Sequence, residues 1–413
     1  MFMSESEEDI KADIEPAVDR EEQPGEMEPL VLSEASPHRH SLNDIAVELA
    51  AASAGFRRSL PAGVVKALAD LVRAMNCYYS NLIEGHDTHP VDIERAMKND
   101  YSADAGKRNL QLEAKAHVTV QRWIDGGGLA GRAVTADALS EIHRRFGELL
   151  PGELLKMSEP DTHEEIAVRP GQLRRRDVRV GRHIPVSPGA LPRFLARFEQ
   201  VYGRLGRSET ILATAAAHHR LLWIHPFLDG NGRVARLMSH AVMLDALDTG
   251  GIWSVARGLA RNESSYKTHL ANCDAQRRND LDGRGPLSEE ALAAFTRFFL
   301  EICLDQVRFM ETLVQPDRLR DRILRWTEEE VRANSLPAKA GQVMEAVLFR
   351  GELPRGDVPA LLGAGERQTR RVVSALMERG VLVSESTRAS LFLTFPAVLA
   401  PRWMPGLFPE KPA

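Results

Sequence analysis

Apolar residues along this 413-residue chain fall mostly in helical spacing, and only short segments alternate with a period of two. One clear case is the run Val234, Leu237, Met238, Ala241 and Val242, whose intervals of three and four place these side chains on one helix face. The pattern predicts a mainly α fold, with β structure confined to two hairpins. The helices expected span residues 44–83, 107–123, 137–149, 192–202, 211–224, 234 onward, 288–313, 318–333, 342–348, 355–362 and 366–379.

The first predicted hairpin lies within residues 169–185. Val178 and Val180 alternate with arginines there, Gly181 supplies a turn, and Pro and Gly bound the run. The unpaired edge of such a hairpin can bind an extended peptide, although an ordinary surface hairpin would show the same pattern. Its basic cluster either attracts an acidic or nucleotide-carrying partner or is a solvated charge run: Arg174, Arg175, Arg176, Arg179 and Arg182.

The segment from Ile224 to Arg236 carries the densest chemistry in the chain. Gly230-Asn231-Gly232 reads as the joint between two helices, where unpaired N–H groups and a helix N-terminus form an anion-binding nest. Arg233 and Arg236 lie three apart on the first turn of the second helix and suit a di- or triphosphate. Asp229 is placed to hold a divalent cation, and His225 to take a proton from a hydroxyl. The constellation indicates transfer from a nucleotide to a hydroxyl.

Residues 225–236 resemble the signature of the Fic family, His-Pro-Phe-x-(Asp/Glu)-Gly-Asn-Gly-Arg-x-x-Arg, at every fixed position. The resemblance implies a helical Fic unit over about residues 45–315 that transfers AMP from ATP to a hydroxyl of a target protein. The same resemblance makes His225 the general base and makes Asp229 the residue that binds Mg²⁺. It also assigns the α-phosphate to Asn231 and the nest, the β-phosphate to Arg233 and the γ-phosphate to Arg236. By the same resemblance the hairpin 169–185 is the flap that pins the target.

A second match, Ser80-Asn81-Leu82-Ile83-Glu84-Gly85, resembles the Fic inhibitory motif. In the family the glutamate, here Glu84, pairs with the second arginine of the signature, here Arg236, and blocks the γ-phosphate. A carboxylate can compete with phosphate for a guanidinium by the same bidentate geometry. The alternative is a plain helix end with Gly85 as the residue after the C-cap.

Other candidate residues are less sharply marked. Fic relatives place an aromatic residue against the adenine, and Tyr266 stands at the corresponding place. His218 and His219 are expected to pack between helices rather than to bind a metal. The three cysteines are few and scattered, which favours a reducing cytoplasm, and neither a signal peptide nor a membrane span is expected in the sequence.

Charge is spread unevenly beneath the overall net charge of −5. Residues 1–40 carry twelve acidic against three basic residues, which predicts a disordered acidic tail. Residues 318–413 carry fifteen basic against eleven acidic residues. The four parts expected are the tail 1–40, a helical region 41–130 with the inhibitory motif, the Fic core 131–315, and a linker with a further domain over 316–413.

The predicted order of elements after residue 340 is helix, short helix, turn, helix and hairpin, which resembles a winged helix-turn-helix. The outer face of its third helix carries the candidates for DNA contact, Arg367, Gln368, Arg370 and Arg371. Such modules also dimerise or dock proteins, so a homodimer is left open.

Two hypotheses therefore stand. The first is an autoinhibited protein adenylyltransferase that modifies Ser, Thr or Tyr of a target, and also itself, and releases pyrophosphate. The second is a DNA-binding transcriptional regulator whose Fic core binds a nucleotide only as a ligand. Because every fixed catalytic position is filled, including His225, the first is favoured.

Overall fold

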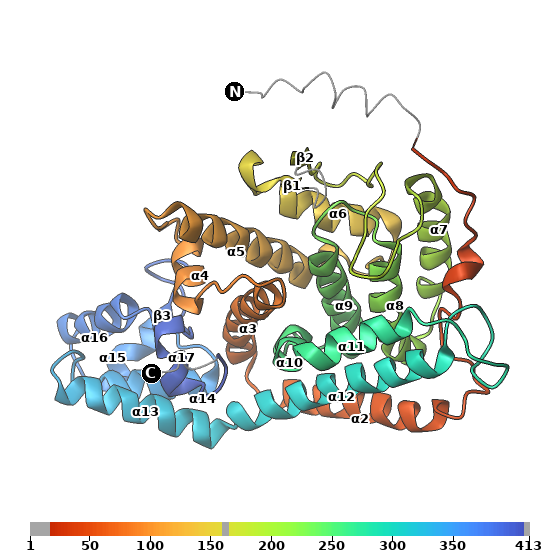
Figure 1. The fold of residues 1–413 in the computed structure, drawn as a ribbon. Helices are drawn as coiled ribbons and strands as arrows, with labels where there is room; N and C mark the ends of the chain where they lie inside the picture. Colours follow the sequence, from red (N-terminus) through yellow and green to blue (C-terminus); the bar gives the residue numbers. More distant parts are fainter. Residues whose placement is uncertain (1–16, 159–164, 409–413) are drawn as a thin grey trace. The chain divides into compact units, whose positions relative to one another are not determined.

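The computed structural model describes residues 17–158 and 165–408, and Figure 1 shows that helices dominate them. The chain divides into two compact units, which are described separately. Residues 1–49, 115–247 and 258–303 form the first unit, and residues 50–114, 248–257 and 304–413 form the second. The mainly α fold predicted from the sequence is confirmed. The helices are α2 (Arg39–Arg58), α3 (Ala62–Ile83), α4 (Pro90–Met97), α5 (Ala105–Trp123), α6 (Ala136–Gly147), α7 (Leu191–Tyr202), α8 (Arg207–Ile224), α9 (Asn231–Leu247), α10 (Val255–Arg261), α11 (Glu263–Cys273), α12 (Glu289–Leu313), α13 (Pro316–Arg332), α14 (Ala340–Arg350), α15 (Val358–Leu362), α16 (Glu366–Glu378) and α17 (Ala400–Trp403).

The centre of the first unit is the helix pair α8 and α9, which form the most extensive contact between described elements. Small side chains make this close approach feasible, because Ala215, Ala216 and Ala217 of α8 are almost fully buried. Helix α7 packs against α8, and α6 packs against α9. Both helices of the pair are buried on most of their surface, so the loop that joins them is held on a rigid base.

The first hairpin differs from its prediction. The paired strands are β1 (Lys156–Ser158) and β2 (Glu165–Ala167), which are antiparallel and precede the predicted range. Residues 169–187, here called the flap segment, show one β-bridge among the described residues, between Val180 and His183 across a two-residue turn. The two arms of the flap segment, on either side of this turn, also bond to other parts of the unit: the Arg174 N–H, for example, donates to the Pro226 carbonyl at 2.9 Å.

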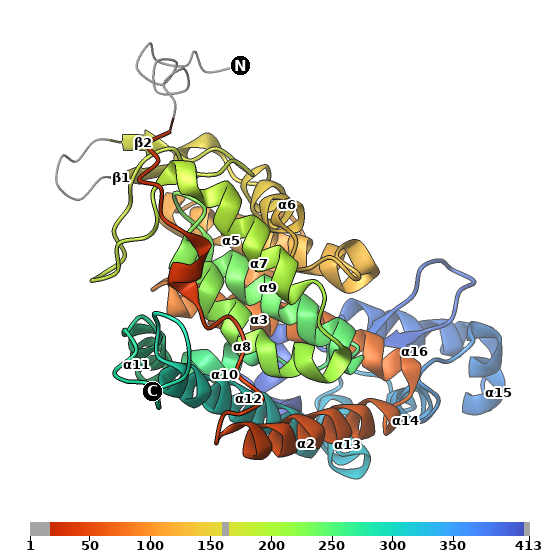
Figure 2. The ribbon, with the colours of Figure 1, turned by 90° about the vertical axis from the view of Figure 1, so that its right-hand side faces the viewer.

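The prediction of disorder through residue 40 is wrong for residues 17–40, while residues 1–16 lie outside the described range. Met27, Leu30 and Leu32 are 0%, 1% and 6% exposed, and residues 24–27 form a short 3-10 helix, η1 (Pro24–Met27). Figures 1 and 2 both show this red segment running beside α7. A few apolar anchors in a mostly acidic stretch are enough to fix it, and an average over composition hides them.

In the second unit, α3 ends at Ile83, within the segment that resembles the inhibitory motif. The Gly85 N–H donates to the Leu82 carbonyl at 3.0 Å and the His86 N–H to the Asn81 carbonyl at 2.9 Å. Gly85 has φ of 85°, a left-handed value that glycine adopts without steric cost. The predicted helix end at Gly85 is therefore confirmed.

The C-terminal elements follow the predicted order closely. Helices α14, α15 and α16 are followed by the antiparallel strands β3 (Leu382–Val383) and β4 (Phe392–Leu393), and Leu353 bridges to Leu391 beside them. Helix α16 buries Val372, Val373 and Leu376, as its period predicts. In the described part of the chain, no helix combines the length and apolar character needed to cross a membrane.

Candidate active site

The joint between α8 and α9 is a tight loop closed by an asparagine side chain. The Asn231 side chain accepts from the Phe227 N–H at 3.0 Å and donates to the Phe227 carbonyl at 2.8 Å. Gly230 has φ of 78°, a left-handed value that also favours glycine. The resemblance assigns the α-phosphate to Asn231 directly. Both ends of its amide instead bond to the loop, so Asn231 shapes the nest.

The nest itself is the first turn of α9. The first helical bond runs from the Val234 N–H to the Gly230 carbonyl, so the N–H groups of Asn231, Gly232 and Arg233 precede it. Donors at this position have no partner within their helix and point out of its positive end. Asp229 stands exposed just before the turn. The loop therefore offers converging N–H donors and one carboxylate.

His225 ends α8 in a left-handed conformation, with φ of 52° and ψ of 62°. Its Nδ1 lies 3.3 Å from the Leu222 carbonyl, a contact that places the ring proton on Nδ1 and leaves the Nε2 lone pair unprotonated. The pKa of His225 is lowered to about 4, chiefly by burial and in part by the charge of Arg174. At neutral pH the imidazole is therefore uncharged, which is the form a general base needs.

The two signature arginines are buried on α9. Arg233 is 9% exposed, and its guanidinium lies 5.2 Å from the centre of the Phe146 ring. Arg236 is 4% exposed, and burial together with its charge lowers the pKa of His117 and of His218 to about 3. The two positive charges create a strong positive potential at the start of α9, because buried charges are screened little by water.

Arg174 is a functional residue that the sequence analysis undervalued. Most of its basic cluster was expected to be solvated, yet Arg174 is only 2% exposed. Its Nε donates to the His225 carbonyl at 2.8 Å, one terminal nitrogen donates to the Arg176 carbonyl at 3.0 Å, and the other to the Val186 carbonyl. Burial lowers its pKa to about 10, so it stays charged at neutral pH. Arg174 thus joins both arms of the flap segment to the end of α8 that carries His225.

His143 was missed by the sequence analysis. Its ring stacks on Phe227 with centroids 4.1 Å apart and an interplanar angle of 4°. The Gly171 N–H donates to its Nδ1 at 2.8 Å, which leaves the ring proton on Nε2, and burial lowers the pKa of His143 to about 4. His143 therefore contacts the nest loop through Phe227 and connects the flap segment to this loop through Gly171. A histidine on an amphipathic helix carries no motif that would reveal this role.

A pocket opens beside this histidine in the first unit. Asp229, Gly230 and Arg233 form its polar end, and its walls include Phe146, Leu150, Leu154, Leu155 and Val168. A polar end with apolar walls is the usual make-up of a small-molecule site.

The adenine role predicted for Tyr266 is contradicted. Its ring is 2% exposed and tilts against Phe295 with centroids 6.5 Å apart, and its hydroxyl lies 2.7 Å from His218 Nε2. Stacking on a base needs an accessible ring face, and this ring is enclosed by helices. His218 also contacts Ser239 Oγ at 2.9 Å, in line with the packing role expected for it.

The remaining predicted residues are placed as follows. In the flap segment, Val178 is half-buried, while Val180 and Gly181 are exposed. Ser80 is buried and Glu84 exposed at the end of α3. Glu84 belongs to the second unit and Arg236 to the first, so their pairing stays a prediction. The predicted site residues that lie in the first unit are Val178, Val180, Gly181, His225, Asp229, Gly230, Asn231, Gly232, Arg233 and Arg236.

Fold and site together define a helical protein with an anion-binding turn between two buried helices and a neutral histidine at its edge. Residues 133–243 match the Fic/DOC family, so this part of the chain is similar to a Fic domain. A solved structure described as a Fic family protein from Desulfovibrio desulfuricans aligns with a TM-score of 0.51 and 16% identity. The alignment covers 88% of this chain and 98% of that one, and it supports the shared fold.

The curated relatives extend beyond the matched region. Over 172 residues the chain is 27% identical to protein adenylyltransferase Fic of Drosophila erecta and 28% identical to the protein of that name in Drosophila melanogaster. Each match covers 41% of this chain and 32% of the relative. The chain thus matches about a third of the length of these relatives.

Proposed function

We propose that this chain is a protein adenylyltransferase that transfers AMP from ATP to a serine, threonine or tyrosine hydroxyl of a target protein. The observation that carries the proposal is His225, an uncharged imidazole whose Nε2 is unprotonated at the lip of the nest. The names of the curated Drosophila relatives agree with this activity.

The reaction follows from the residues present. His225 Nε2 takes the hydroxyl proton as the oxygen attacks the α-phosphorus of ATP. A bond forms between this oxygen and the α-phosphorus, the bond from the α-phosphorus to the bridging oxygen breaks, and pyrophosphate leaves. Arg233, Arg236 and the N–H groups of the nest stabilise the negative charge that builds on the phosphates. The target keeps AMP as a phosphodiester, and His225 keeps the proton.

Asp229 is the residue that would hold the Mg²⁺ that accompanies ATP. Its carboxylate is exposed beside the nest, and oxygen ligands suit this cation. No group of three or more histidine, cysteine or acidic residues gathers among residues 17–158 and 165–408 into a metal site. The cation would therefore depend on the nucleotide for further ligands and, when bound, would neutralise phosphate charge.

The position of the label distinguishes AMP transfer from other chemistry. The wild-type protein is incubated with Mg²⁺ and with ATP labelled at either the α- or the γ-phosphate, together with a cell lysate as acceptor. Label is expected on protein only from the α-position. Label retained only from the γ-position would indicate phosphate transfer instead, and label from neither would contradict the proposal.

The same assay tests the inhibitory role proposed for Glu84. A carboxylate bound to a guanidinium excludes the γ-phosphate from that arginine, and charge-assisted bonds of this kind contribute about 1.5–3 kcal/mol. Glu84→Gly is therefore expected to raise α-label transfer at least about tenfold. Glu148→Gly, which removes an exposed carboxylate bonded to Arg144 on α6, is the matched control. Equal transfer by wild type and Glu84→Gly would end the autoinhibition proposal.

DNA binding by the C-terminal region is the second candidate function. The observation that favours it is the row of exposed side chains on α16, where Arg367, Gln368, Arg370 and Arg371 all face solvent. If these residues contact phosphate, duplex DNA is expected to retain the protein at low salt and release it as salt rises. Replacing Arg370 and Arg371 by glutamine should then weaken retention about tenfold or more. Absence of binding at low salt would remove this candidate.

A further inference from the structure

Residues 18–22, here called the strap, bind one arm of the flap segment through Ser187, which is fully buried. The Glu22 carboxylate accepts from the Ser187 N–H at 2.8 Å and from the Ser187 hydroxyl at 2.6 Å. The Arg20 N–H donates to the same hydroxyl oxygen at 3.0 Å. Three hydrogen bonds thus connect the strap to a residue more than 160 positions away in the sequence.

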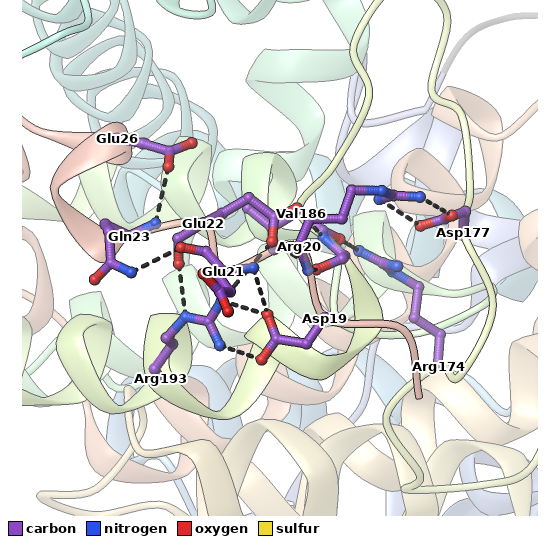
Figure 3. Close-up of polar contacts among 11 residues, drawn as sticks. Asp19, Arg20, Glu21, Glu22, Gln23, Glu26, Arg174, Asp177, Val186 and Arg193 are labelled. Carbon is purple, nitrogen blue, oxygen red and sulfur yellow. Dashed lines mark hydrogen bonds and ion pairs between the residues drawn. The ribbon is translucent and has the colours of Figure 1, made fainter. Parts of the chain in front are cut away.

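The strap also binds the other arm. The Arg20 guanidinium donates two bonds to the Asp177 carboxylate, one of them at 3.1 Å. Figure 3 shows Arg20 reaching Asp177 while Glu22 lies toward Arg193. Because Asp177 and Ser187 stand on opposite sides of the turn at 180–183, the strap holds the two arms together from outside.

Helix α7 and the turn before it anchor the strap. The two terminal nitrogens of Arg193 each donate to the Asp19 carboxylate at 2.6 Å, and its Nε donates to the Glu22 carbonyl at 2.6 Å. The bond from Arg193 lowers the pKa of Asp19 to about 2. The Gly189 N–H donates to the Val18 carbonyl at 2.8 Å, and a Cβ at Gly189 would lie 2.6 Å from the Asp19 Cβ. The two backbones approach so closely that only glycine fits at position 189, which indicates that this turn is shaped to bind the strap.

The arms held by the strap are the ones that Arg174 connects to His225. Arg174 binds the Val186 carbonyl, one residue before Ser187, and the His225 carbonyl. We propose that the strap positions the flap segment for target docking, so that Arg20 and Glu22 set the apparent affinity for the protein acceptor. The docking role rests on the proposed AMP transfer. The mechanical role of the strap, which is to hold the two arms of the flap segment together, does not.

Amide hydrogen exchange tests the mechanical role in the full chain without any need for activity. In Glu22→Ala the amides of residues 174–190 are expected to exchange about tenfold faster, because a buried serine loses two partners. Arg20→Ala, which removes an exposed ion pair, is expected to speed exchange about threefold. Glu22→Gln keeps an oxygen for the Ser187 N–H and should restore most of the protection. Glu290→Ala breaks a similarly exposed ion pair with Arg278 and should leave these amides unchanged.

Transfer kinetics test the docking role, with the His225→Ala chain as acceptor and α-labelled ATP as donor. The KM for the acceptor is expected to rise about fivefold in Glu22→Ala, while the KM for ATP and kcat stay near wild type. Glu22→Gln should lie close to wild type.

The outcomes separate the two proposals. Unchanged exchange at residues 174–190 in Glu22→Ala would overturn the strap while leaving AMP transfer intact. Faster exchange with an unchanged acceptor KM would reduce the strap to a stabilising contact and overturn the docking role. If wild type transfers no AMP at all, the proposed function fails, and the exchange data alone decide whether the strap holds the flap segment.

Discussion

Replacing His225 by alanine is expected to lower kcat for AMP transfer by a factor of about 10³, within the range that general-base catalysis contributes. The imidazole is half-buried and uncharged, its Nδ1 is held by Leu222, and its Nε2 is the unprotonated nitrogen beside the nest. Binding of ATP should change little, since the nest and both arginines remain. The measurement is the rate of α-label transfer at saturating ATP, together with the ATP dissociation constant by calorimetry.

His269→Ala is the matched control for this loss. His269 is a half-buried histidine of α11 that stacks on Phe298, with centroids 4.6 Å apart. It should transfer AMP at close to the wild-type rate. A His225→Ala protein that keeps more than about a tenth of the wild-type kcat would show that the hydroxyl is deprotonated by another group.

The pH profile of the wild-type rate offers an independent check. Burial lowers the pKa of His225 to about 4, so the free base predominates throughout the range from pH 6 to 8. The rate should therefore stay nearly constant in that range. A fall of about fourfold between pH 7.5 and pH 6 in a folded protein would mean that His225 titrates near the usual histidine value instead.

Local signals made most helices predictable. The ends of α16 and α3, for example, follow from glycines that adopt left-handed angles at Gly380 and Gly85. The nest was predictable for the same reason, because Gly-Asn-Gly between two apolar runs specifies a joint and the helix N-terminus after it. Information of this kind lies within a few consecutive residues.

The parts that were missed depend on contacts between distant residues. Arg174 is one of five arginines in a short stretch, and nothing in its neighbours marks it as the one that is buried against the His225 carbonyl. Tyr266 is an ordinary aromatic residue until His218 and Phe295 enclose it. The strap lies in an acidic stretch, and residues far along the chain, such as Ser187 and Arg193, bind its charged side chains in an ordered contact.

Acidification is expected to destabilise the first unit strongly, because it holds four buried histidines and the half-buried His225 in the neutral form. Burial lowers the pKa to about 3 for His117 and His218 and to about 4 for His143, His219 and His225. In the unfolded chain each titrates near 6.5, so between pH 6.5 and 4 the unfolded state binds more protons than the native state. The free energy of unfolding must therefore fall as pH falls through this window and be fully recovered above it.

The expected loss at pH 5 is about 2 kcal/mol for each of these histidines. Their sum is comparable with the whole stability of a typical domain, about 5–15 kcal/mol, so the first unit should unfold before pH 4 is reached. Chemical denaturation at pH 7.5, 6 and 5 measures this slope, and carboxylates such as Asp19, whose pKa is about 2, titrate below the window.

Two variants identify the histidines as the source of the slope. His218→Gln removes one of the five titrating groups, so the dependence of unfolding free energy on pH should lessen by about a fifth, whatever the variant's stability at pH 7.5. His40→Gln replaces a side chain that is 94% exposed and should leave the slope unchanged. A protein that is as stable at pH 5 as at pH 7.5 would show that these histidines are solvated in the folded state. The neutral state inferred for His225 would then be wrong as well.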